Sequence, residues 1–371
     1  MTLRVLVVTT VHVPRDARID HRQVGALLRA GAEVTHVAPW TAQEADQADP
    51  RGPVRRVPVP RSVGRRRLGP LLAAARVTRR LVDQHDIVLL HDPELLLLAP
   101  LLVRRRPVVW DVHEDTAASL TDRSWVPTPV VRLVRHAVHA AERWADRRLH
   151  LLLAEHSYAD LFRGDHPVVP NVPFLLEAPP GPAGERVVYV GRVSRSRGAE
   201  ALLRLPDHLP PGLRLEIVGP PDADVARPLA AAAAAGRLTA HGFVPNAQAL
   251  ELVDGAFAGL SLLQDHPNHR DCLQSKVLEY LERGVPVVAT DLRVAGAFVR
   301  DRGVGAVVPT GSPDEVAAAV GRALAAWVED PGRREEAARR GRALVVEGMN
   351  WDVEGARFVA HLRRWAAEGR P

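Results

Sequence analysis

Short apolar runs alternate with longer segments of helical periodicity along almost the whole chain. The runs are rich in valine and leucine, as at residues 4–9 and 186–190. Continuous apolar runs of this length are typical of strands buried on both faces of a parallel sheet that helices cover. The sequence therefore predicts an α/β fold of doubly wound parallel sheets.

This alternation occurs twice. In the first half we expect strands at 4–9, 33–38, 87–90, 107–111 and 150–153, with helices near 18–29, 69–82 and 129–148. In the second half we expect strands at 186–190, 214–218, 238–240, 259–262, 286–289 and 306–308. Three helical segments, near 313–328, 333–345 and 353–364, follow the last strand.

A break between the two halves indicates two domains. The 371 residues, 46% of them hydrophobic, suffice for two cores. Residues 173–185 contain Pro179, Pro180, Gly181, Pro182 and Gly184, which the interior of a helix or strand does not tolerate. We therefore expect an N-terminal domain at 1–172, a linker at 173–185 and a C-terminal domain at 186–350. We expect residues 351–371 to form a helix that packs back across the linker.

Several classes of protein are disfavoured by what the sequence lacks. Its single cysteine, Cys272, excludes a disulfide framework and multi-cysteine metal sites. The loop after the first strand, Thr9 to Asp16, has no dinucleotide-binding glycines, and no phosphate-loop motif occurs. With 4% aromatic residues and no reader motif, we expect no nucleic-acid partner. No leader and no apolar stretch of about 20 residues is found, so we expect a soluble, cytoplasmic protein.

Basic residues are concentrated in one segment. The net charge is +5, and ten arginines but no acidic residue lie between Arg51 and Val82. One interpretation is a solvated loop and helix face. The other is attraction to an anionic lipid surface or to a phosphorylated substrate, so that the segment from Arg51 to Arg80 would make peripheral membrane contact.

Lys276 is the only lysine among 49 basic residues. It precedes apolar Val277, Leu278 and Leu281 at helical spacing, and Gly284 then ends the predicted helix. Lys276 therefore lies in the first turn, where free backbone N–H groups and the helix dipole already favour an anion. A cation there is poor for stability but suits a phosphate ligand. The alternative is a chance lysine on a solvated turn.

Two acidic residues flank this lysine. Asp271 lies in the loop before the helix, and Glu279 lies about one turn inside it. This spacing allows one carboxylate to face a sugar and the other to accept hydrogen bonds from a ribose diol. Cys272, beside Asp271, is interpreted as a packed small side chain and not as a nucleophile.

Six further segments accompany the one around Lys276: residues 190–198, 217–219, 241–245, 91–94, 111–114 and 169–173. Together with residues 275–289 they resemble the retaining glycosyltransferases of family 4, the glycosyl transferases group 1. The resemblance spans nearly the whole chain. It implies the GT-B fold, in which two Rossmann-like domains face a central cleft.

The resemblance also implies residue roles. It assigns donor binding to Gly191, Arg192, Arg197, Phe243, Val244, Leu273, Gln274, Lys276 and Glu279. Arg197 stands where the family usually has lysine. His113 and Asp271 are expected at the reacting sugar, and Asp271 is one methylene shorter than the usual glutamate. Acceptor binding is expected at His12, Asp16, Arg18 and Glu114, although Asp16 and Arg18 could instead cap a helix or pair with each other.

The implied reaction moves a sugar from a UDP- or GDP-sugar to an unidentified acceptor, either a small molecule or a lipid-linked one. No metal and no other cofactor are expected, since clustered cations and a helix N-terminus stabilise the leaving diphosphate. Asp222 and Asp224 are interpreted as a helix-starting turn and not as metal ligands. Two alternatives remain open: a noncatalytic sugar-nucleotide-binding protein and a sugar-nucleotide 2-epimerase.

Overall fold

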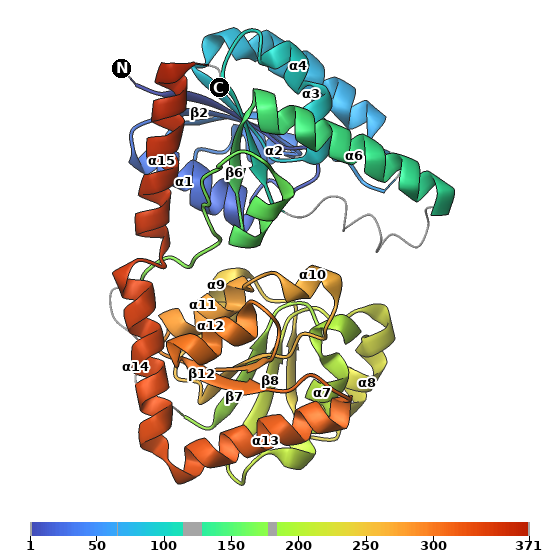
Figure 1. Cartoon of the computed structure of the whole chain (residues 1–371), viewed down its shortest axis with the longest axis vertical. Helices are drawn as coiled ribbons and strands as arrows, with labels where there is room; N and C mark the ends of the chain where they lie inside the picture. The colour runs from blue at the N-terminus through green and yellow to red at the C-terminus, as the bar shows by residue number, and fades with distance from the viewer. Residues whose placement is uncertain (1, 65, 114–127, 177–183, 370–371) are drawn as a thin grey trace. The chain divides into compact units, whose positions relative to one another are not determined.

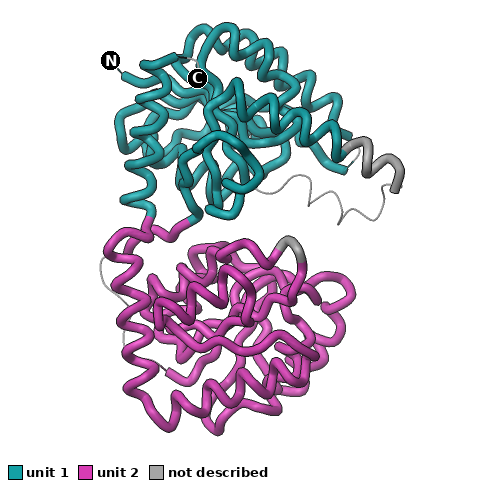
Figure 2. Tube along the Cα trace, in the orientation of Figure 1, with its two compact units in different colours: residues 1–171, 351–371 teal, residues 172–350 magenta. Residues whose placement is uncertain are grey.

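The computed structural model describes residues 2–64, 66–113, 128–176 and 184–369. The chain forms two compact units, shown in different colours in Figure 2. Unit 1 comprises Met1–Asn171 and Trp351–Pro371, and unit 2 comprises Val172–Asn350. Most of the expected linker, residues 177–183, lies outside the described residues.

Unit 1 is built on a six-stranded parallel sheet with the order β3-β2-β1-β4-β5-β6 (Figure 1). Its strands are β1 (Arg4–Val8), β2 (Glu33–Ala38), β3 (Val54–Pro58), β4 (Ile87–Leu90), β5 (Val108–Val112) and β6 (His150–Leu153). The five strands expected from the apolar runs are confirmed within a residue or so. The sixth, β3, escaped prediction because it is an edge strand that carries two arginines and a proline, with only Arg56 buried.

The helical segments of unit 1 connect these strands. They are η1 (Ala17–Val24), α1 (Gly25–Arg29), α2 (Ala42–Asp46), α3 (Leu68–Leu81), η2 (Val82–Gln84), η3 (Pro93–Leu97), α4 (Ala99–Leu102), α6 (Thr128–Arg148), η4 (His156–Leu161) and α15 (Trp351–Glu368). In Figure 1 the C-terminal helix α15, drawn in red, lies beside α1. The indole Nε1 of Trp351 donates to the Arg22 carbonyl at 2.9 Å, which attaches the buried start of α15 to η1.

Unit 2 repeats the architecture with the strand order β12-β11-β10-β7-β8-β9. Its strands are β7 (Arg186–Val190), β8 (Arg214–Val218), β9 (Thr239–Gly242), β10 (Ala258–Ser261), β11 (Val287–Thr290) and β12 (Gly305–Val308). Its helical segments are η5 (Arg195–Arg197), α7 (Ala199–Arg204), η6 (Leu205–His208), α8 (Ala223–Ala234), α9 (Asn246–Glu251), α10 (Pro267–Arg270), α11 (Ser275–Glu282), α12 (Ala295–Arg302), α13 (Pro313–Glu329) and α14 (Pro331–Glu347). All six strands expected for this half are present.

Helix α11 packs tightly on the sheet of unit 2. A Cβ atom at Gly259 of β10 would lie 2.3 Å from the ring of Tyr280, so only glycine admits this contact. The buried Tyr280 hydroxyl then accepts a hydrogen bond from the Val190 amide at 2.8 Å. This packing fixes the start of α11 relative to the carboxyl end of β7.

The helix α11 is also attached to the segment that enters unit 2. The buried Glu282 carboxylate accepts from the Leu176 amide at 2.8 Å and from Arg342 at 2.7 Å. Arg342 donates in turn to the Leu176 carbonyl at 2.6 Å.

Among the described residues, no helix is long and apolar enough to cross a membrane.

Candidate functional site

The first cluster of candidate residues lies at the carboxyl ends of the strands in unit 2. Lys276 is in the first turn of α11, as the sequence predicts, but its side chain is only 6% exposed. Its Nζ lies 3.8 Å from the centre of the Tyr189 ring and makes no hydrogen bond to any described residue. The interpretation as a solvated turn is therefore wrong. A buried cation without a hydrogen bond is unfavourable unless a ligand supplies one.

The electrostatic surroundings of Lys276 explain its ionisation. Burial, reinforced by the nearby positive charge of Arg197, lowers the pKa of Lys276 to about 7, although Glu279 opposes this effect. Arg197 is half-buried at the end of η5, and Glu279 is half-buried in the second turn of α11. The structure thus brings together three of the expected donor-site residues. An anion placed here would relieve the repulsion between the two cations.

Two features of the backbone shape this cluster. Gly191 has φ +125°, and a Cβ atom there would lie 3.3 Å from the Lys276 Nζ. A side chain at this position would crowd the lysine, so glycine keeps the space open. Gln274 is the N-cap of α11, and its side chain accepts from Ser261 at 3.0 Å. The backbone after Leu273 therefore enters the helix with its first amide groups unsatisfied within α11.

Arg192, expected in donor binding, and Asp271, expected at the reacting sugar, both form ion pairs in this structure. The exposed Arg192 forms an ion pair with Asp222 at 2.5 Å, and Asp222 is the N-cap of α8. Asp222 therefore acts at a helix start, as predicted. Asp271 is half exposed and pairs with Arg293 at 2.6 Å.

The loop after β9 carries the remaining donor-site candidates, Phe243 and Val244. Phe243 is 76% exposed, which is unusual for an aromatic residue, whereas Val244 is partly buried. An exposed ring on this loop is available to contact a planar ligand.

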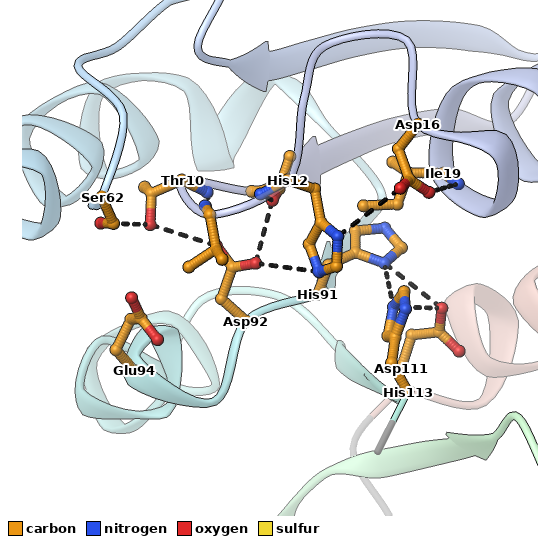
Figure 3. A network of polar contacts seen from close by, with 12 residues as sticks. Thr10, His12, Asp16, Ile19, Ser62, His91, Asp92, Glu94, Asp111 and His113 are labelled. Atoms are coloured by element: carbon orange, nitrogen blue, oxygen red, sulfur yellow. Dashed lines mark hydrogen bonds and ion pairs between the residues drawn. The ribbon is translucent and has the colours of Figure 1, made fainter. Parts of the chain in front are cut away.

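The second cluster lies at the carboxyl ends of β1, β4 and β5 in unit 1 (Figure 3). The fully buried Asp92 accepts hydrogen bonds from the Thr9 hydroxyl at 2.9 Å, the Thr10 hydroxyl at 3.1 Å and the Val11 amide at 3.1 Å. Asp92 thereby fixes the loop that follows β1. Its role was not predicted, although it follows His91 in one of the motifs quoted above.

His12 lies on this fixed loop. Its ring stacks on that of His113, with centroids 5.0 Å apart, and its nitrogens lie 3.6 Å from Asp16 and from Asp92. Asp16 caps η1 by accepting from the amides of Arg18 and Ile19. Burial opposes ionisation of Asp16, but its hydrogen bonds to His12 and to these amides outweigh burial and lower its pKa.

Arg18 requires a correction. It was expected either in acceptor binding or paired with Asp16, but its side chain is buried and pairs with Asp111 at 2.6 and 2.8 Å. It also donates to the Val169 carbonyl at 2.9 Å and to Asn171 at 3.0 Å. With these bonds made, the buried guanidinium of Arg18 is engaged within unit 1. Glu114, another acceptor-site candidate, lies outside the described residues.

Asp111 is the centre of the polar network in unit 1. It is fully buried and lies 3.0 Å from the Nε2 of His113 and 3.3 Å from the Nδ1 of His91. Burial would raise the pKa of Asp111, but Arg18 and His113 together hold it well below its ordinary value. Burial lowers the pKa of His91 to about 4, so this ring is neutral near pH 7. No pattern in the sequence marked Arg18 as the partner of Asp111.

The side chains of His91, Asp111 and His113 offer ligand atoms within 4.8 Å of one another, close enough to hold a metal ion. However, the carboxylate of Asp111 already accepts two bonds from Arg18 and one from Gln23 at 2.7 Å. A divalent ion at this point would be placed beside the Arg18 guanidinium and repelled by it. The donor set therefore fits a hydrogen-bonded network better than a metal site.

Comparisons with known proteins bear on both clusters. Residues 184–326, which include Gly191, Arg197 and Lys276, match the family model of the glycosyl transferases group 1. The chain is 29% identical over 341 residues to phosphatidyl-myo-inositol mannosyltransferase of Mycobacterium tuberculosis, covering 85% of this chain and 84% of that protein.

Two solved structures resemble the fold. HepE of Anabaena in complex with UDP superposes with a TM-score of 0.71 at 15% identity, covering 98% of this chain and 100% of that chain. Sucrose-phosphate synthase from Thermosynechococcus elongatus superposes with a TM-score of 0.73 at 16% identity, covering 99% and 100%. The likeness thus extends over both six-stranded sheets.

Proposed function

Because the chain is a glycosyltransferase of group 1 with the GT-B fold and a nucleotide-sugar donor, we propose that it transfers a hexose, mannose first among the candidates, to a phosphoinositide lipid. We propose that the anomeric configuration of the sugar is retained. The sugar and acceptor are taken from the relative, a phosphatidyl-myo-inositol mannosyltransferase. The donor is a GDP- or UDP-sugar.

The observation that carries the proposal is the buried Lys276. Transfer of a sugar from a nucleotide diphosphate leaves a dianion, and groups that stabilise this charge lower the barrier. Lys276 has no hydrogen bond to a described residue, lies in the first turn of α11 and is close enough to Arg197 for their charges to repel. A diphosphate at this position would accept from Lys276 and from the first amides of α11, and it would neutralise both cations.

The remaining candidates receive roles in the same proposal. Glu279 holds the ribose hydroxyls, and the exposed Phe243 and the adjacent Val244 contact the base. His113 contacts the reacting sugar, and the acceptor proton passes to the departing phosphate. Arg192 and Asp271 exchange their present ion-pair partners, Asp222 and Arg293, for the donor when it binds.

The direct test uses GDP-mannose, UDP-glucose and dTDP-glucose, each with vesicles that contain phosphatidylinositol. Mass spectrometry of the extracted lipid should show a mass increase of one hexose with one of these donors. Donor alone serves as the control for the 2-epimerase alternative, in which an epimer or glycal accumulates without acceptor. Donor binding without any product in either arm would instead support a noncatalytic binding protein and contradict the proposal.

A lipid acceptor also requires contact with a membrane, and we propose that one face of unit 1 provides it. Helix α3 exposes Leu68 and Leu72, and the η3–α4 segment exposes Leu97 and Leu101. Leu72 and Leu101 line a groove of about 580 Å³ between the two segments, together with four arginines: Arg76, Arg79, Arg80 and Arg105. Exposed apolar side chains among cations are typical of surfaces that bind anionic lipid.

This proposal assigns membrane contact to only part of the basic segment from Arg51 to Arg80. Arg51 and Arg56 form ion pairs with Asp20 and Asp49, and Arg67 pairs with Glu94. The charges of these three arginines are therefore paired with carboxylates of unit 1. Of the other described arginines of the segment, Arg76, Arg79 and Arg80 lie on α3, next to the exposed leucines, and Arg55, Arg61 and Arg66 are also exposed.

Flotation with vesicles that contain anionic lipid tests the membrane face. The triple variant Arg76→Gln, Arg79→Gln and Arg80→Gln should lose most binding at low salt, since each basic residue contributes about 1 kcal/mol near such a surface. The matched control is the pair Arg339→Gln and Arg340→Gln on α14, which removes two exposed arginines from unit 2. Failure of the wild-type protein to float, or equal loss in the control, would contradict the proposed face.

A further inference from the structure

Asp111 is held by three hydrogen bonds from two buried side chains, Arg18 and Gln23. The guanidinium of Arg18 donates to both of its carboxylate oxygens, at 2.6 and 2.8 Å, and Gln23 donates from its Nε2 at 2.7 Å. All three side chains are buried. Arg18 is fixed further by its bonds to the Val169 carbonyl and to Asn171. The position of the carboxylate is therefore determined by η1, β5 and the segment that leaves unit 1.

This carboxylate faces one ring nitrogen of His113. The Nε2 of His113 lies 3.0 Å from the Oδ2 of Asp111 and 3.0 Å from the Nδ1 of His91. An ionised carboxylate only accepts hydrogen bonds, so the contact between Nε2 and Asp111 is a hydrogen bond when Nε2 carries the proton, and the Nδ1 of His91 then faces the same N–H as a second acceptor. In the neutral imidazole the other nitrogen, Nδ1, is then an acceptor. The His113 side chain is 16% exposed and follows directly after β5.

We propose that Arg18, Gln23 and Asp111 are positioning residues that hold His113 in the Nε2–H tautomer, so that its Nδ1 accepts a hydrogen bond from a substrate hydroxyl. The role of His113 at the substrate rests on the proposed function. The tautomer is inferred from the contact between Nε2 and the Asp111 carboxylate within unit 1. His12, stacked on the His113 ring, restricts the ring's rotation. The inference assigns a role to Arg18 and Gln23 that neither the sequence motifs nor the comparisons assign.

The decisive variant is Asp111→Asn, because a neutral amide has one acceptor oxygen, which Arg18, Gln23 and His113 would then share, and it holds the Nε2 proton less strongly than a carboxylate does. In wild-type protein labelled with ¹⁵N-histidine, the His113 resonances should show a protonated Nε2, and they are identified by their loss in His113→Ala. In Asp111→Asn these resonances should show a mixture of the two tautomers. Turnover should fall about 10-fold or more, as expected for a weakened hydrogen bond to a charged group, while the KM for the donor changes less than about threefold.

Two comparisons separate positioning from a merely structural role. The double variant Asp111→Asn/His113→Ala should be no less active than His113→Ala alone, because the two residues act as one unit. Asp86→Asn, which breaks the exposed pair with Arg4 at the opposite end of the sheet, is the matched control and should leave turnover unchanged. If Asp111→Asn does not fold, Gln23→Met keeps the Arg18–Asp111 pair and the Nε2–H tautomer, and it should lower turnover about 3- to 10-fold because the carboxylate is held less firmly.

Several results would overturn the proposal. These are an Nδ1–H tautomer in the wild-type protein, unchanged turnover in folded Asp111→Asn or in Gln23→Met, and additive losses in the double variant. The proposal would also be overturned if the wild-type protein bound one equivalent of zinc and the His91→Ala variant did not. His91, Asp111 and His113 would then be metal ligands. If no donor is turned over, the proposed function fails, but the labelled spectra still decide the tautomer.

Discussion

Replacing Lys276 with methionine should make unit 2 more stable and its nucleotide binding weaker. Methionine fills a similar length of the buried slot but carries no charge. The Lys276 Nζ is desolvated above the Tyr189 ring, and no described residue hydrogen-bonds to it. Burying this unpaired charge lowers the stability of the ligand-free protein. Removing the charge should therefore raise the free energy of unfolding.

The magnitude follows from ionisation. Lowering the pKa of Lys276 from 10.5 to about 7 destabilises the folded, charged form by about 5 kcal/mol, at 1.36 kcal/mol for each factor of ten. At pH 7, where half the folded protein is already neutral, the cost is about 4 kcal/mol. The lost cation–π contact with Tyr189 offsets part of the gain. We expect Lys276→Met to stabilise unit 2 by about 2–4 kcal/mol at this pH.

The sign of the pH dependence is also fixed. Between pH 7 and 10.5 the unfolded lysine binds more protons than the folded one, so the free energy of unfolding rises with pH across this window. Below pH 7 both forms are protonated, and the full penalty applies. The Lys276→Met variant should lack this rise. For the ligand, loss of one hydrogen bond to a charged group costs about 1.5–3 kcal/mol, which weakens nucleotide binding about 10- to 150-fold.

Two measurements check this prediction. Unfolding in guanidinium at pH 6.5 and 9.5, monitored through hydrogen exchange in peptides of β7 and β10, reports on unit 2 alone. Titration calorimetry with GDP and UDP gives the nucleotide affinity. Arg237→Met is the matched control, because this exposed arginine precedes β9, at the amino ends of the strands, whereas Lys276 lies at their carboxyl ends. A variant that is less stable at pH 7, or whose nucleotide affinity stays within threefold of wild type, would refute the reasoning.

Three further predictions concern the support of the same site. Tyr280→Phe should lower the free energy of unfolding of unit 2 by about 1–3 kcal/mol, measured by guanidinium unfolding, because the buried Val190 amide loses its acceptor; an unchanged midpoint would count against this. Gly198→Ala should destabilise unit 2 by about 2–4 kcal/mol and weaken nucleotide binding, because φ is +84° and a Cβ would lie 2.1 Å from the Leu262 carbonyl oxygen; a wild-type Tm would be inconsistent with it. Nucleotide binding at pH 8 should take up a proton, because a bound diphosphate raises the low pKa of Lys276; calorimetry in buffers of different ionisation enthalpy should reveal it, and the same experiment on Lys276→Met should not.

The sheets were predictable because a strand that is buried on both faces is a short run of apolar residues in the sequence. Strand β4 is apolar throughout, and β1 and β7 are apolar after a first arginine, so their bounds follow from the flanking polar residues. Strand β3 is not such a run, since an edge strand needs only part of one face to be apolar.

The candidate site was predictable where local structure decides it. Lys276 lies at a helix start whatever surrounds that helix, and periodicity alone places it there. Its burial above Tyr189 depends on a residue 87 positions earlier in the chain, which no local pattern reports. The Arg18–Asp111 pair joins residues 93 positions apart, so sequence reasoning offered the neighbouring Asp16 instead.

A crystal structure of the full chain with GDP or UDP examines most directly whether Lys276 is the phosphate ligand of unit 2. The account predicts a pyrophosphate oxygen about 2.7–2.9 Å from the Lys276 Nζ, a second contact from Arg197, and the first amides of α11 directed at the same group. A nucleotide bound with its phosphates outside this cluster, and Lys276 still buried against Tyr189 without a phosphate contact, would contradict it.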